Sequence, residues 1–395
     1  MAVKSGREIV SDSGRPMQKS TNDRLNKVIS KTVSSIPYRF GETKELITIA
    51  LGIIKYLTPL KLFNFLIREL ERLKRVERPR GFPFHAVIDI TNVCNLQCPY
   101  CPTGRRQNSG RSQRIIDIDL LRIFLDNIGI YLMIADLFNW GEPLLHPQIA
   151  NIVTMFHERR IFHHISTNLN IHNKQVLEKV CDAGLDLLTI SISGITQEIY
   201  ENYHKEGDVN LVFDNVKHII NYKNKLKYTN PTIAFKYLVF KHNFHQIDKA
   251  RKLAKEMGVD IFWICYAGGP EDKILPIDEE KKRLLYPGTG TFCSQLWGTI
   301  VLNCDGGITP CCLLYFKKDD FTEYLQANTV NIVDIISNNK YIIARKLFKI
   351  SSVAEFPQNL EHPCLKCTFV HRQRHLTEYL ASNPNAKQRH RTGGP

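Results

Sequence analysis

Six short apolar runs alternate with longer amphipathic segments over residues 85–266. Alternation of this kind is typical of strand–helix units, in which each helix returns the chain to the same edge of the sheet and so makes the strands parallel. We therefore predict an α/β fold with a parallel sheet that is curved or barrel-like. The predicted strands are 85–91, 131–140, 162–168, 185–193, 232–240 and 260–266.

Simple patterns exclude several other classes of protein. A composition of 43% hydrophobic and 23% charged residues is ordinary for a globular chain and excludes a fibrous or wholly disordered one. The sequence has no apolar run of about 18 residues, and its first residues lack the apolar core of a secretory signal, so we expect a cytoplasmic protein. It also has no GxGxxG after the first predicted strand and no GxxxxGKS/T, which disfavours nucleotide-binding α/β folds.

The net charge of +14 is concentrated at the two ends of the chain. Residues 1–80 hold 17 Lys and Arg against 8 Asp and Glu, and residues 371–395 hold 5 against 1, whereas residues 81–370 hold 31 against 30. Basic ends favour an anionic partner such as a membrane surface, a nucleic acid or a phosphorylated molecule. A solvated basic fringe, with a flexible tail over 371–395, is the plainer interpretation.

Residues 1–80 are predicted to form a basic, partly helical N-terminal extension. Thr58 and Pro59 are a typical cap and first turn of a helix. The helix is amphipathic, and two interpretations stay open: it packs on the main domain, or it lies in a membrane interface and gives the protein a peripheral membrane contact. The apolar stripe of this helix consists of Leu62, Phe63, Leu66, Ile67 and Leu70.

Eleven cysteines in a chain expected in a reducing compartment indicate metal or catalytic roles rather than disulfides. Cys94, Cys98 and Cys101 have the spacing C-x3-C-x2-C and directly follow the first predicted strand, where α/β barrels place their chemistry. Three thiolates this close can hold an iron–sulfur cluster and leave one iron open to a small molecule. Zinc is the competing metal, although no second cysteine pair follows within the next 60 residues.

This motif resembles that of the radical S-adenosylmethionine (radical SAM) superfamily, and the resemblance covers roughly 85–280. It implies a partial (β/α)6 TIM-like barrel, assigned here to residues 81–285. It also implies a [4Fe–4S] cluster on Cys94, Cys98 and Cys101, the predicted catalytic residues, whose open iron binds S-adenosylmethionine (SAM). One electron would then cleave SAM to a 5′-deoxyadenosyl radical that abstracts hydrogen from the substrate.

The resemblance extends to the loops after the later predicted strands. Three residues depart from the family's pattern: Trp140 and Leu169 stand where the family has glycine, and Ser193 stands where it has an acidic residue. It implies eight SAM-binding residues. These are Tyr100 for the adenine, Gly141 and Glu142 for the amino group, Ser166 and Asn168 for the methionine and ribose, Ser191 and Ser193 for the ribose or carboxylate, and Lys236 for the carboxylate of SAM or of an anionic substrate.

The late cysteines resemble the SPASM-type C-terminal extension of radical SAM enzymes, assigned here to residues 286–370. A hairpin is predicted around the turn at Asp305 and Gly306. The resemblance implies one auxiliary [4Fe–4S] cluster with four thiolate ligands. Structural zinc is the alternative metal, Cys312 is an alternative to Cys311, and Cys304 and Cys181 are expected to be spare. The implied ligands are Cys293, Cys311, Cys364 and Cys367.

The predicted function is therefore a radical SAM enzyme that abstracts hydrogen from a substrate carbon and leads to dehydrogenation, epimerisation or rearrangement. The expected substrate is a small anionic molecule, such as a sugar nucleotide or a lipid-linked sugar, and the expected reducing partner is a flavodoxin or ferredoxin.

Three alternative functions remain. The chain could mature a ribosomal peptide or protein, although no domain resembling a peptide-recognition module precedes the barrel. It could also be an iron–sulfur electron-transfer or scaffold protein that binds SAM without turning it over. Nucleic-acid modification is the third option: the basic tail permits it, although no aromatic–basic binding module supports it and a nucleic-acid partner is not the expected one.

Overall fold

The computed structural model describes residues 43–112, 114–266, 293–323, 332–349 and 361–367. All of them belong to one compact unit of the chain. The first half of the predicted N-terminal extension and the basic tail predicted at 371–395 lie outside the described residues. The predicted domain boundaries stay a prediction.

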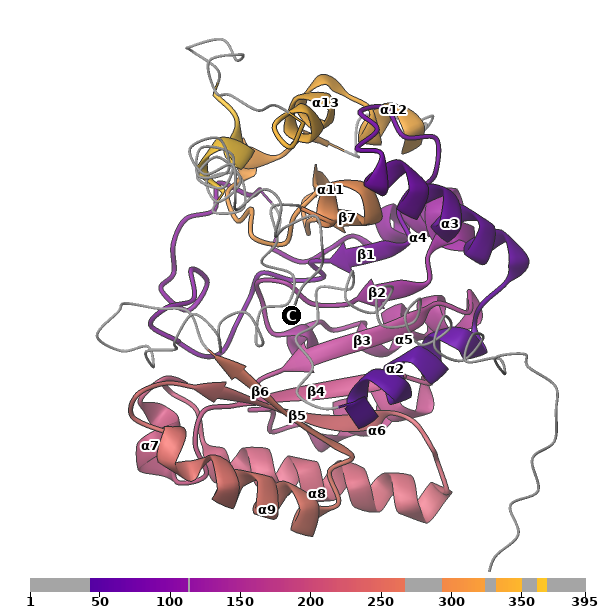
Figure 1. The fold of residues 1–395 in the computed structure, drawn as a ribbon. Coiled ribbons are helices and arrows are strands. Elements are labelled where there is room, and N and C mark those ends of the chain that lie inside the picture. The colour runs from indigo at the N-terminus through magenta and orange to yellow at the C-terminus, as the bar shows by residue number, and fades with distance from the viewer. Residues whose placement is uncertain (1–42, 113, 267–292, 324–331, 350–360, 368–395) are drawn as a thin grey trace, which may run out of the picture. The chain divides into compact units, whose positions relative to one another are not determined.

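The described strands form one nine-stranded sheet with the order β6-β5-β4-β3-β2-β1-β7-β8-β9. The first six strands pair in parallel with their neighbours, which confirms the predicted α/β fold with six parallel strands (Figure 1). These strands are β1 (His85–Ile88), β2 (Ile134–Asp136), β3 (Phe162–Thr167), β4 (Leu187–Ile192), β5 (Thr232–Val239) and β6 (Ile261–Tyr266).

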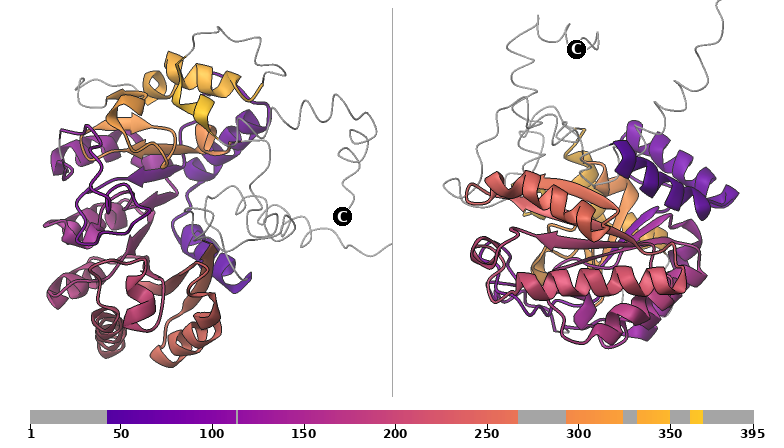
Figure 2. Two further views of the ribbon diagram at one scale, coloured as in Figure 1. Left: turned by 90° about the vertical axis from the view of Figure 1, so that its left-hand side faces the viewer. Right: turned by 90° about the horizontal axis from the view of Figure 1, so that it is seen from below.

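Helices cover the outer face of the curved sheet (Figures 1 and 2). Several begin at a side chain that accepts hydrogen bonds from the free backbone N–H groups of the first turn, as Asp117, Asn173 and Asp208 do. Their apolar faces and the outward side chains of the strands form one buried core. The helices are α4 (Ile118–Ile128), α5 (Ile149–Glu158), α6 (Lys174–Asp182), α7 (Gln197–Glu201), α8 (Val209–Leu226) and α9 (Ile247–Met257), with 3-10 turns η1 (Gly129–Tyr131), η2 (Pro143–Leu145) and η3 (Phe244–Gln246).

The predicted N-terminal helices are α2 (Thr43–Lys55) and α3 (Pro59–Leu73). The Thr58 side chain accepts a hydrogen bond from the backbone N of Lys61 at 3.2 Å, so the predicted start of α3 is confirmed. Both helices pack on the main domain at the amino-terminal ends of the strands. There the Tyr56 hydroxyl donates to Oδ1 of Asp186 at 3.0 Å.

The C-terminal residues extend the barrel sheet instead of forming a sheet of their own. Strand β7 (Thr299–Leu302) pairs in parallel with β1, and the predicted hairpin is confirmed by the antiparallel pairing of β7 with β8 (Gly307–Thr309). This region is completed by β9 (Thr322–Glu323), α11 (Gln295–Gly298), α12 (Ile332–Ile336), α13 (Asn339–Lys346) and the 3-10 turns η4 (Lys317–Asp319) and η6 (Pro363–Lys366).

The N-terminal and C-terminal parts of the chain meet at a buried tryptophan. The indole N–H of Trp297 donates to the carbonyl O of Val76 at 2.8 Å. Beside it, the fully buried Arg345 donates to the carbonyl oxygens of Leu296, Glu77 and Ile336. These bonds satisfy a buried guanidinium, which would otherwise be costly. Among the helices that the structure describes, none combines the length and apolar character needed to cross a lipid bilayer.

Candidate functional site

The loop that carries Cys94, Cys98 and Cys101 leaves the carboxyl end of β1 and folds back on itself. The backbone N of Cys101 donates to the carbonyl O of Cys98 at 3.2 Å. Gly104 follows in close contact: a Cβ at this position would lie 2.5 Å from the backbone N of Cys98. Only glycine fits there without moving the loop.

The three thiols of this loop lie within electrostatic range of one another. Burial and the neighbouring thiols raise the pKa of Cys94 to about 11 and that of Cys98 to about 12. The side-chain amide of Asn168 lies 3.8 Å from the sulfur of Cys94. Partly exposed thiols gathered on a short loop are a donor set that fits an iron–sulfur cluster.

The loop after β2 packs directly on the cysteine loop. A Cβ at Gly141 would lie 2.0 Å from the carbonyl O of Thr91 and 2.7 Å from that of Val93. The next residue, Glu142, donates its backbone N–H to the same Val93 carbonyl at 2.8 Å. The glycine therefore allows the two loops to touch, and a SAM contact at this residue stays a prediction.

The carboxylate of Glu142 is buried and bonded to the chain itself. It accepts hydrogen bonds from the Thr167 hydroxyl at 2.6 Å, from the backbone N of Asn168 at 2.7 Å and from that of Leu144 at 3.1 Å. Burial raises the pKa of Glu142 to about 7. The structure thus gives this side chain a positioning role between the loops after β2 and β3, which the sequence analysis did not anticipate.

The loop after β3 keeps its turn although Leu169 replaces the family's glycine. Leu169 is fully buried and has φ +54°, a left-handed conformation that costs a leucine free energy. Its backbone N–H donates to the Thr167 hydroxyl at 2.8 Å, and the Asn168 amide donates to Oδ1 of Asn95 at 2.9 Å. The turn therefore holds Asn168 against the cysteine loop.

Ser166, Ser191 and Lys236 come together on three adjacent strands. The ammonium group of Lys236 donates to the hydroxyl of Ser166 at 2.9 Å, and Ser191 is the register partner of Lys236. Burial lowers the pKa of Lys236. Within the described residues, no carboxylate lies within ion-pair distance of this ammonium group, so it can receive an anion.

Ser193 is placed differently from the prediction. It is fully buried, and its hydroxyl lies 3.0 Å from the carbonyl O of Tyr200 and 2.7 Å from Nδ1 of His204. These internal bonds use the hydroxyl as a structural group. The expected contact with SAM therefore does not follow from the position of Ser193.

Aromatic side chains surround the predicted adenine residue, Tyr100. Its ring centroid lies 5.9 Å from those of Tyr203 and Phe240. Tyr203 also lies in the electrostatic range of Cys98 and Cys101. Sequence reasoning missed Tyr203 and Phe240, because neither belongs to a motif.

A buried polar network on the inner face of the sheet was also missed. Asp136 lies 3.0 Å from Nε2 of His85 and 3.1 Å from Nδ1 of His164, and Nε2 of His164 lies 2.7 Å from the Thr189 hydroxyl. Burial raises the pKa of Asp136 and lowers that of His164. Sequence reasoning missed this network because its members lie on four different strands and belong to no motif.

A cavity of about 530 Å³ opens beside Cys94. Its lining is polar and includes Asn92, Gln97, Arg106 and Arg114. It gives a small polar molecule or a partner's side chain access to the cysteine loop.

The late cysteines form a second group of thiols. Burial raises the pKa of Cys293 to about 11, and Cys367 and Cys312 are its neighbours. Cys364 lies in the electrostatic range of Cys293, and Cys311 in that of Cys312. The structure therefore brings the four predicted ligands together with Cys312 as a fifth thiol.

The two cysteines expected to be spare lie elsewhere. Cys304 is buried beside Asp89 and Arg111, and Cys181 is buried on α6. Across the residues that the structure describes, no three His, Cys, Asp or Glu side chains converge tightly enough to hold one metal ion. Neither thiol group therefore forms a closed metal site within these residues, and a cluster on either group stays a prediction.

Contacts join the segment that carries Cys311 and Cys312 to the loops around the first thiol group. Trp140, next to Gly141, packs edge-on against Tyr315 with 5.0 Å between the ring centroids. In the orientation that satisfies its amide, Asn139 donates to the carbonyl O of Cys312 at 3.2 Å. The Tyr315 hydroxyl donates to the carbonyl O of Gln107 at 2.8 Å.

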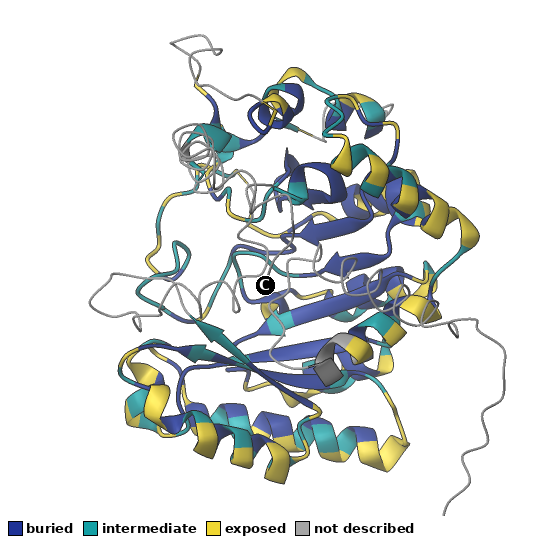
Figure 3. Cartoon of the chain, in the orientation of Figure 1, coloured by how far each residue is buried: buried dark blue, intermediate teal, exposed yellow. Residues whose placement is uncertain are grey.

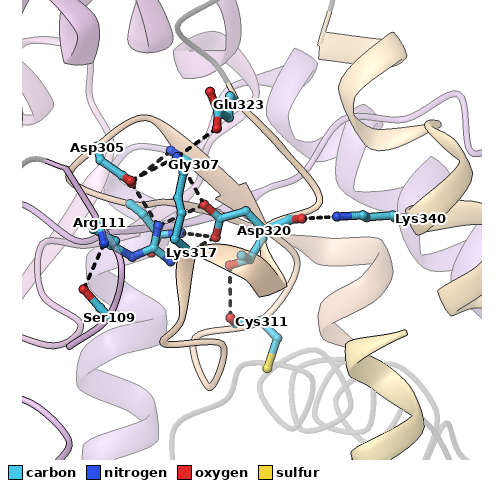
Figure 4. Close-up of polar contacts among 11 residues, drawn as sticks. Ser109, Arg111, Asp305, Gly307, Cys311, Lys317, Asp320, Glu323 and Lys340 are labelled. Atoms are coloured by element: carbon cyan, nitrogen blue, oxygen red, sulfur yellow. Dashed lines mark hydrogen bonds and ion pairs between the residues drawn. The ribbon is translucent and has the colours of Figure 1, made fainter. Parts of the chain in front are cut away.

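Figure 4 shows a buried ion-pair network at the same junction. Nη1 of Arg111, which lies in the segment after Cys101, donates to Asp305 and to Asp320 at 2.9 Å each. Lys317 reaches Oδ2 of Asp305 at 3.0 Å. The network fixes the C-terminal hairpin on the cysteine loop.

Comparison with known proteins is consistent with this geometry. The model of the Radical SAM superfamily matches residues 88–282. A probable GTP 3′,8-cyclase of Methanocaldococcus jannaschii is 31% identical over 135 residues, which is 34% of this chain and 44% of the relative. A PqqA peptide cyclase of Bradyrhizobium diazoefficiens is 24% identical over 143 residues, which is 35% of this chain and 37% of the relative. The chain thus spans less than two thirds of these curated relatives.

Among solved structures, Streptococcus suis SuiB bound to its precursor peptide SuiA aligns with a TM-score of 0.55 and 15% identity, over 78% of this chain and 74% of that one. SuiB bound to SAM aligns with a TM-score of 0.53 and 14% identity, over 78% and 76% of the two chains. These similarities show a shared fold.

Proposed function

We propose, because this chain belongs to the radical SAM superfamily, that it is an enzyme that holds a [4Fe–4S] cluster on Cys94, Cys98 and Cys101 and binds SAM beside it. When bound, the cluster supplies the electron that cleaves SAM, and the resulting 5′-deoxyadenosyl radical removes a hydrogen atom from a substrate carbon. One observation supports this proposal most strongly. The loops after β2 and β3 pack on the cysteine loop through Gly141 and Asn168.

The chain's own residues would bind and orient SAM. Lys236 offers a cation without a described carboxylate partner, and Ser166 and Ser191 place hydroxyl groups beside it. This group fits a carboxylate, either of SAM or of the substrate. Tyr100 supplies an aromatic surface for the adenine, with Tyr203 and Phe240 packed behind it.

A second [4Fe–4S] cluster is proposed on Cys293, Cys364, Cys367 and one of the adjacent pair Cys311 and Cys312. The support is that the other four thiols all lie in the electrostatic range of Cys293. In the absence of metal these buried thiols would stay protonated and uncharged. Iron would bind them as thiolates. A flavodoxin or ferredoxin is the proposed reductant.

A peptide or protein is the proposed substrate class. Two relatives' names point to it: a PqqA peptide cyclase, and SuiB in complex with its precursor peptide. These names favour the alternative reached from the sequence over its first choice, a sugar nucleotide or lipid-linked sugar. A small anionic substrate stays the second candidate, because the ammonium group of Lys236, which has no carboxylate partner among the described residues, would suit it.

The proposal is tested anaerobically after cluster reconstitution, by counting iron and following 5′-deoxyadenosine release from SAM under dithionite. Wild type is compared with a Cys94→Ala/Cys98→Ala/Cys101→Ala variant and a Cys311→Ala/Cys364→Ala/Cys367→Ala variant, and Cys181→Ala is the control. We expect about 8 irons in wild type and in the control and about 4 in each triple variant. Deoxyadenosine release should disappear in the first variant.

Two outcomes would contradict the proposal. Full iron loading without SAM cleavage would favour an electron-transfer or scaffold protein. Zinc in place of iron would exclude radical chemistry at this site. Only after deoxyadenosine release is established do peptides and then anionic sugars become useful substrates to screen.

A further inference from the structure

Helix α3 packs on the domain with its polar face inward. Lys61 and Arg68 are only 3% and 1% exposed, whereas Phe63 and Leu70 are 63% and 56% exposed. An amphipathic helix of a globular protein normally buries its apolar stripe. The stripe that the sequence predicts is present on α3, but most of it faces solvent.

The inward orientation of the polar face is fixed by specific hydrogen bonds. The Asn64 amide donates to the carbonyl O of Phe82 at 3.0 Å and accepts from the backbone N of Phe82 at 2.8 Å. The ammonium group of Lys61 donates to the carbonyl O of Arg160. Rotation of α3 to bury its leucines would break these bonds and leave buried backbone groups without partners.

Helix α2 adds a second exposed apolar stripe. Ile47, Leu51 and Ile54 are more than half exposed and recur at the spacing of one helix face, while Ile49 and Ile53 on the other face are buried. Figure 3 shows exposed residues along both helices. Of the eighteen large apolar side chains found exposed in the described part of the chain, nine lie on α2 and α3. An apolar surface of this extent marks an interaction site.

The charges around this surface indicate its partner. Lys55, Lys74, Arg78 and Arg80 are exposed at the ends of the two helices and just beyond them. The acidic residues of α3 are occupied: Glu69 pairs with Arg72 at 2.6 Å, and Glu71 accepts from the backbone N of Gly81 at 3.1 Å.

Nearby, Glu77 pairs with Lys349 at 2.9 Å. Residues 1–80 as a whole hold 17 basic residues against 8 acidic ones. An apolar helix face bordered by cations is complementary to an anionic lipid surface, which offers negative headgroups above an apolar interior.

We propose that the apolar faces of α2 and α3 bind the surface of an anionic lipid bilayer. Both helices lie at the amino-terminal ends of the strands, where Gly52 packs against Phe162, the first residue of β3. The cysteine loop lies at the carboxyl ends. Docking through α2 and α3 therefore leaves the cysteine loop and its cavity accessible from the aqueous side. This inference does not depend on the proposed function.

The test measures binding of the full chain to vesicles of phosphatidylcholine alone and of phosphatidylcholine mixed in equal parts with phosphatidylglycerol. A Leu62→Gln/Leu66→Gln/Leu70→Gln variant removes apolar side chains that are already exposed, so it should stay folded. An Ile123→Gln/Leu226→Gln/Phe244→Gln variant is the matched control, because it changes equally exposed apolar side chains elsewhere. Circular dichroism checks the folding of both.

We expect wild type and the control to bind the anionic vesicles, and the α3 variant to partition at least about tenfold more weakly. Binding to pure phosphatidylcholine should be weaker, and added salt should reduce binding to the anionic vesicles. Equal vesicle binding by wild type and the α3 variant would overturn the proposal. So would a wild-type dimer that the α3 variant loses, since a second copy would then cover this face.

Deoxyadenosine release in solution should be the same in all three proteins, which separates this test from that of the catalytic proposal.

Discussion

Glu142 holds Asn168 through a buried hydrogen bond of 2.7 Å from the Asn168 backbone N–H to the carboxylate. The two residues come from the loops after different strands, and the side-chain amide of Asn168 lies 3.8 Å from the sulfur of Cys94. Glu142, which the motif marks as a ligand-binding residue, thus also positions the loop after β3 beside the cysteines.

Replacement of Glu142 should loosen this arrangement. In Glu142→Gln the new amide NH2 would face backbone and hydroxyl donors, so we expect a loss of about 1–3 kcal/mol of unfolding free energy and less retained iron. Chemical denaturation and iron analysis measure the two effects. Glu178→Gln, which changes a partly exposed partner of His218, is the control and should cost less than about 1 kcal/mol. Unchanged stability in Glu142→Gln would show that the carboxylate is not needed for positioning.

Gly141→Ala should disrupt the contact between two loops. The added methyl group would lie 2.0 Å from the carbonyl O of Thr91, so the loops must separate. We expect iron bound at the first site, and deoxyadenosine release with it, to fall to a small fraction of the wild-type value. Gly129→Ala is the control, because its added methyl group would meet the nearest atom at an ordinary 3.5 Å. Full activity in Gly141→Ala would refute the close approach.

Arg111→Ala should weaken the junction between the cysteine loop and the C-terminal hairpin. Asp305 and Asp320 would lose a buried cationic partner, and Lys317 would be the cation that stays paired with them among the described residues. We expect a loss of about 3 kcal/mol in unfolding free energy. Iron content should also fall, because the hairpin carries Cys311. Arg122→Ala breaks an exposed pair and should have little effect. Equal stability of the two variants would contradict this role for Arg111.

Ionisation of Asp89 should lower stability as pH rises. Burial raises the pKa of Asp89 from 3.8 to about 7, so between these values the folded protein binds more protons than the unfolded chain. Stability then falls with increasing pH in this window, by at most about 1.4 kcal/mol per pH unit from this group, and levels off above pH 7. Unfolding titrations of wild type and Asp89→Asn measure the difference. An identical slope in both would refute this assignment.

Lys236→Met should weaken binding of an anion at the barrel. Loss of the ammonium group should raise the Kd for SAM or the KM for an anionic substrate by about tenfold or more, with little change in thermal stability, since burial already disfavours the charged form. Calorimetry with SAM alone identifies the ligand that Lys236 binds. A weaker affinity of the variant for SAM would assign Lys236 to SAM, and an unchanged affinity would assign it to the substrate. Lys236→Arg should keep part of the affinity. Lys252→Met, at an exposed ion pair on α9, is the control.

The sequence alone determined the features that depend on short-range order. The alternation of apolar and amphipathic segments specified six parallel strands, because each repeat is a local unit whose helix must return to the same edge. The spacing of Cys94, Cys98 and Cys101 on one loop likewise requires no distant residue. The start of α3 at Thr58 and Pro59 was also readable, since capping involves neighbouring residues.

Tertiary structure decided which way side chains face and what they meet. Glu142 matches a motif for ligand contact, and Ser193 stands where the family has an acid. The structure turns both side chains toward internal partners. The pairing of β7 with β1 joins residues more than two hundred positions apart. The periodicity of α3 revealed an apolar stripe but not its direction. That direction depends on hydrogen bonds from Lys61 and Asn64 to distant backbone groups, so the stripe was left exposed by contacts that no local pattern encodes.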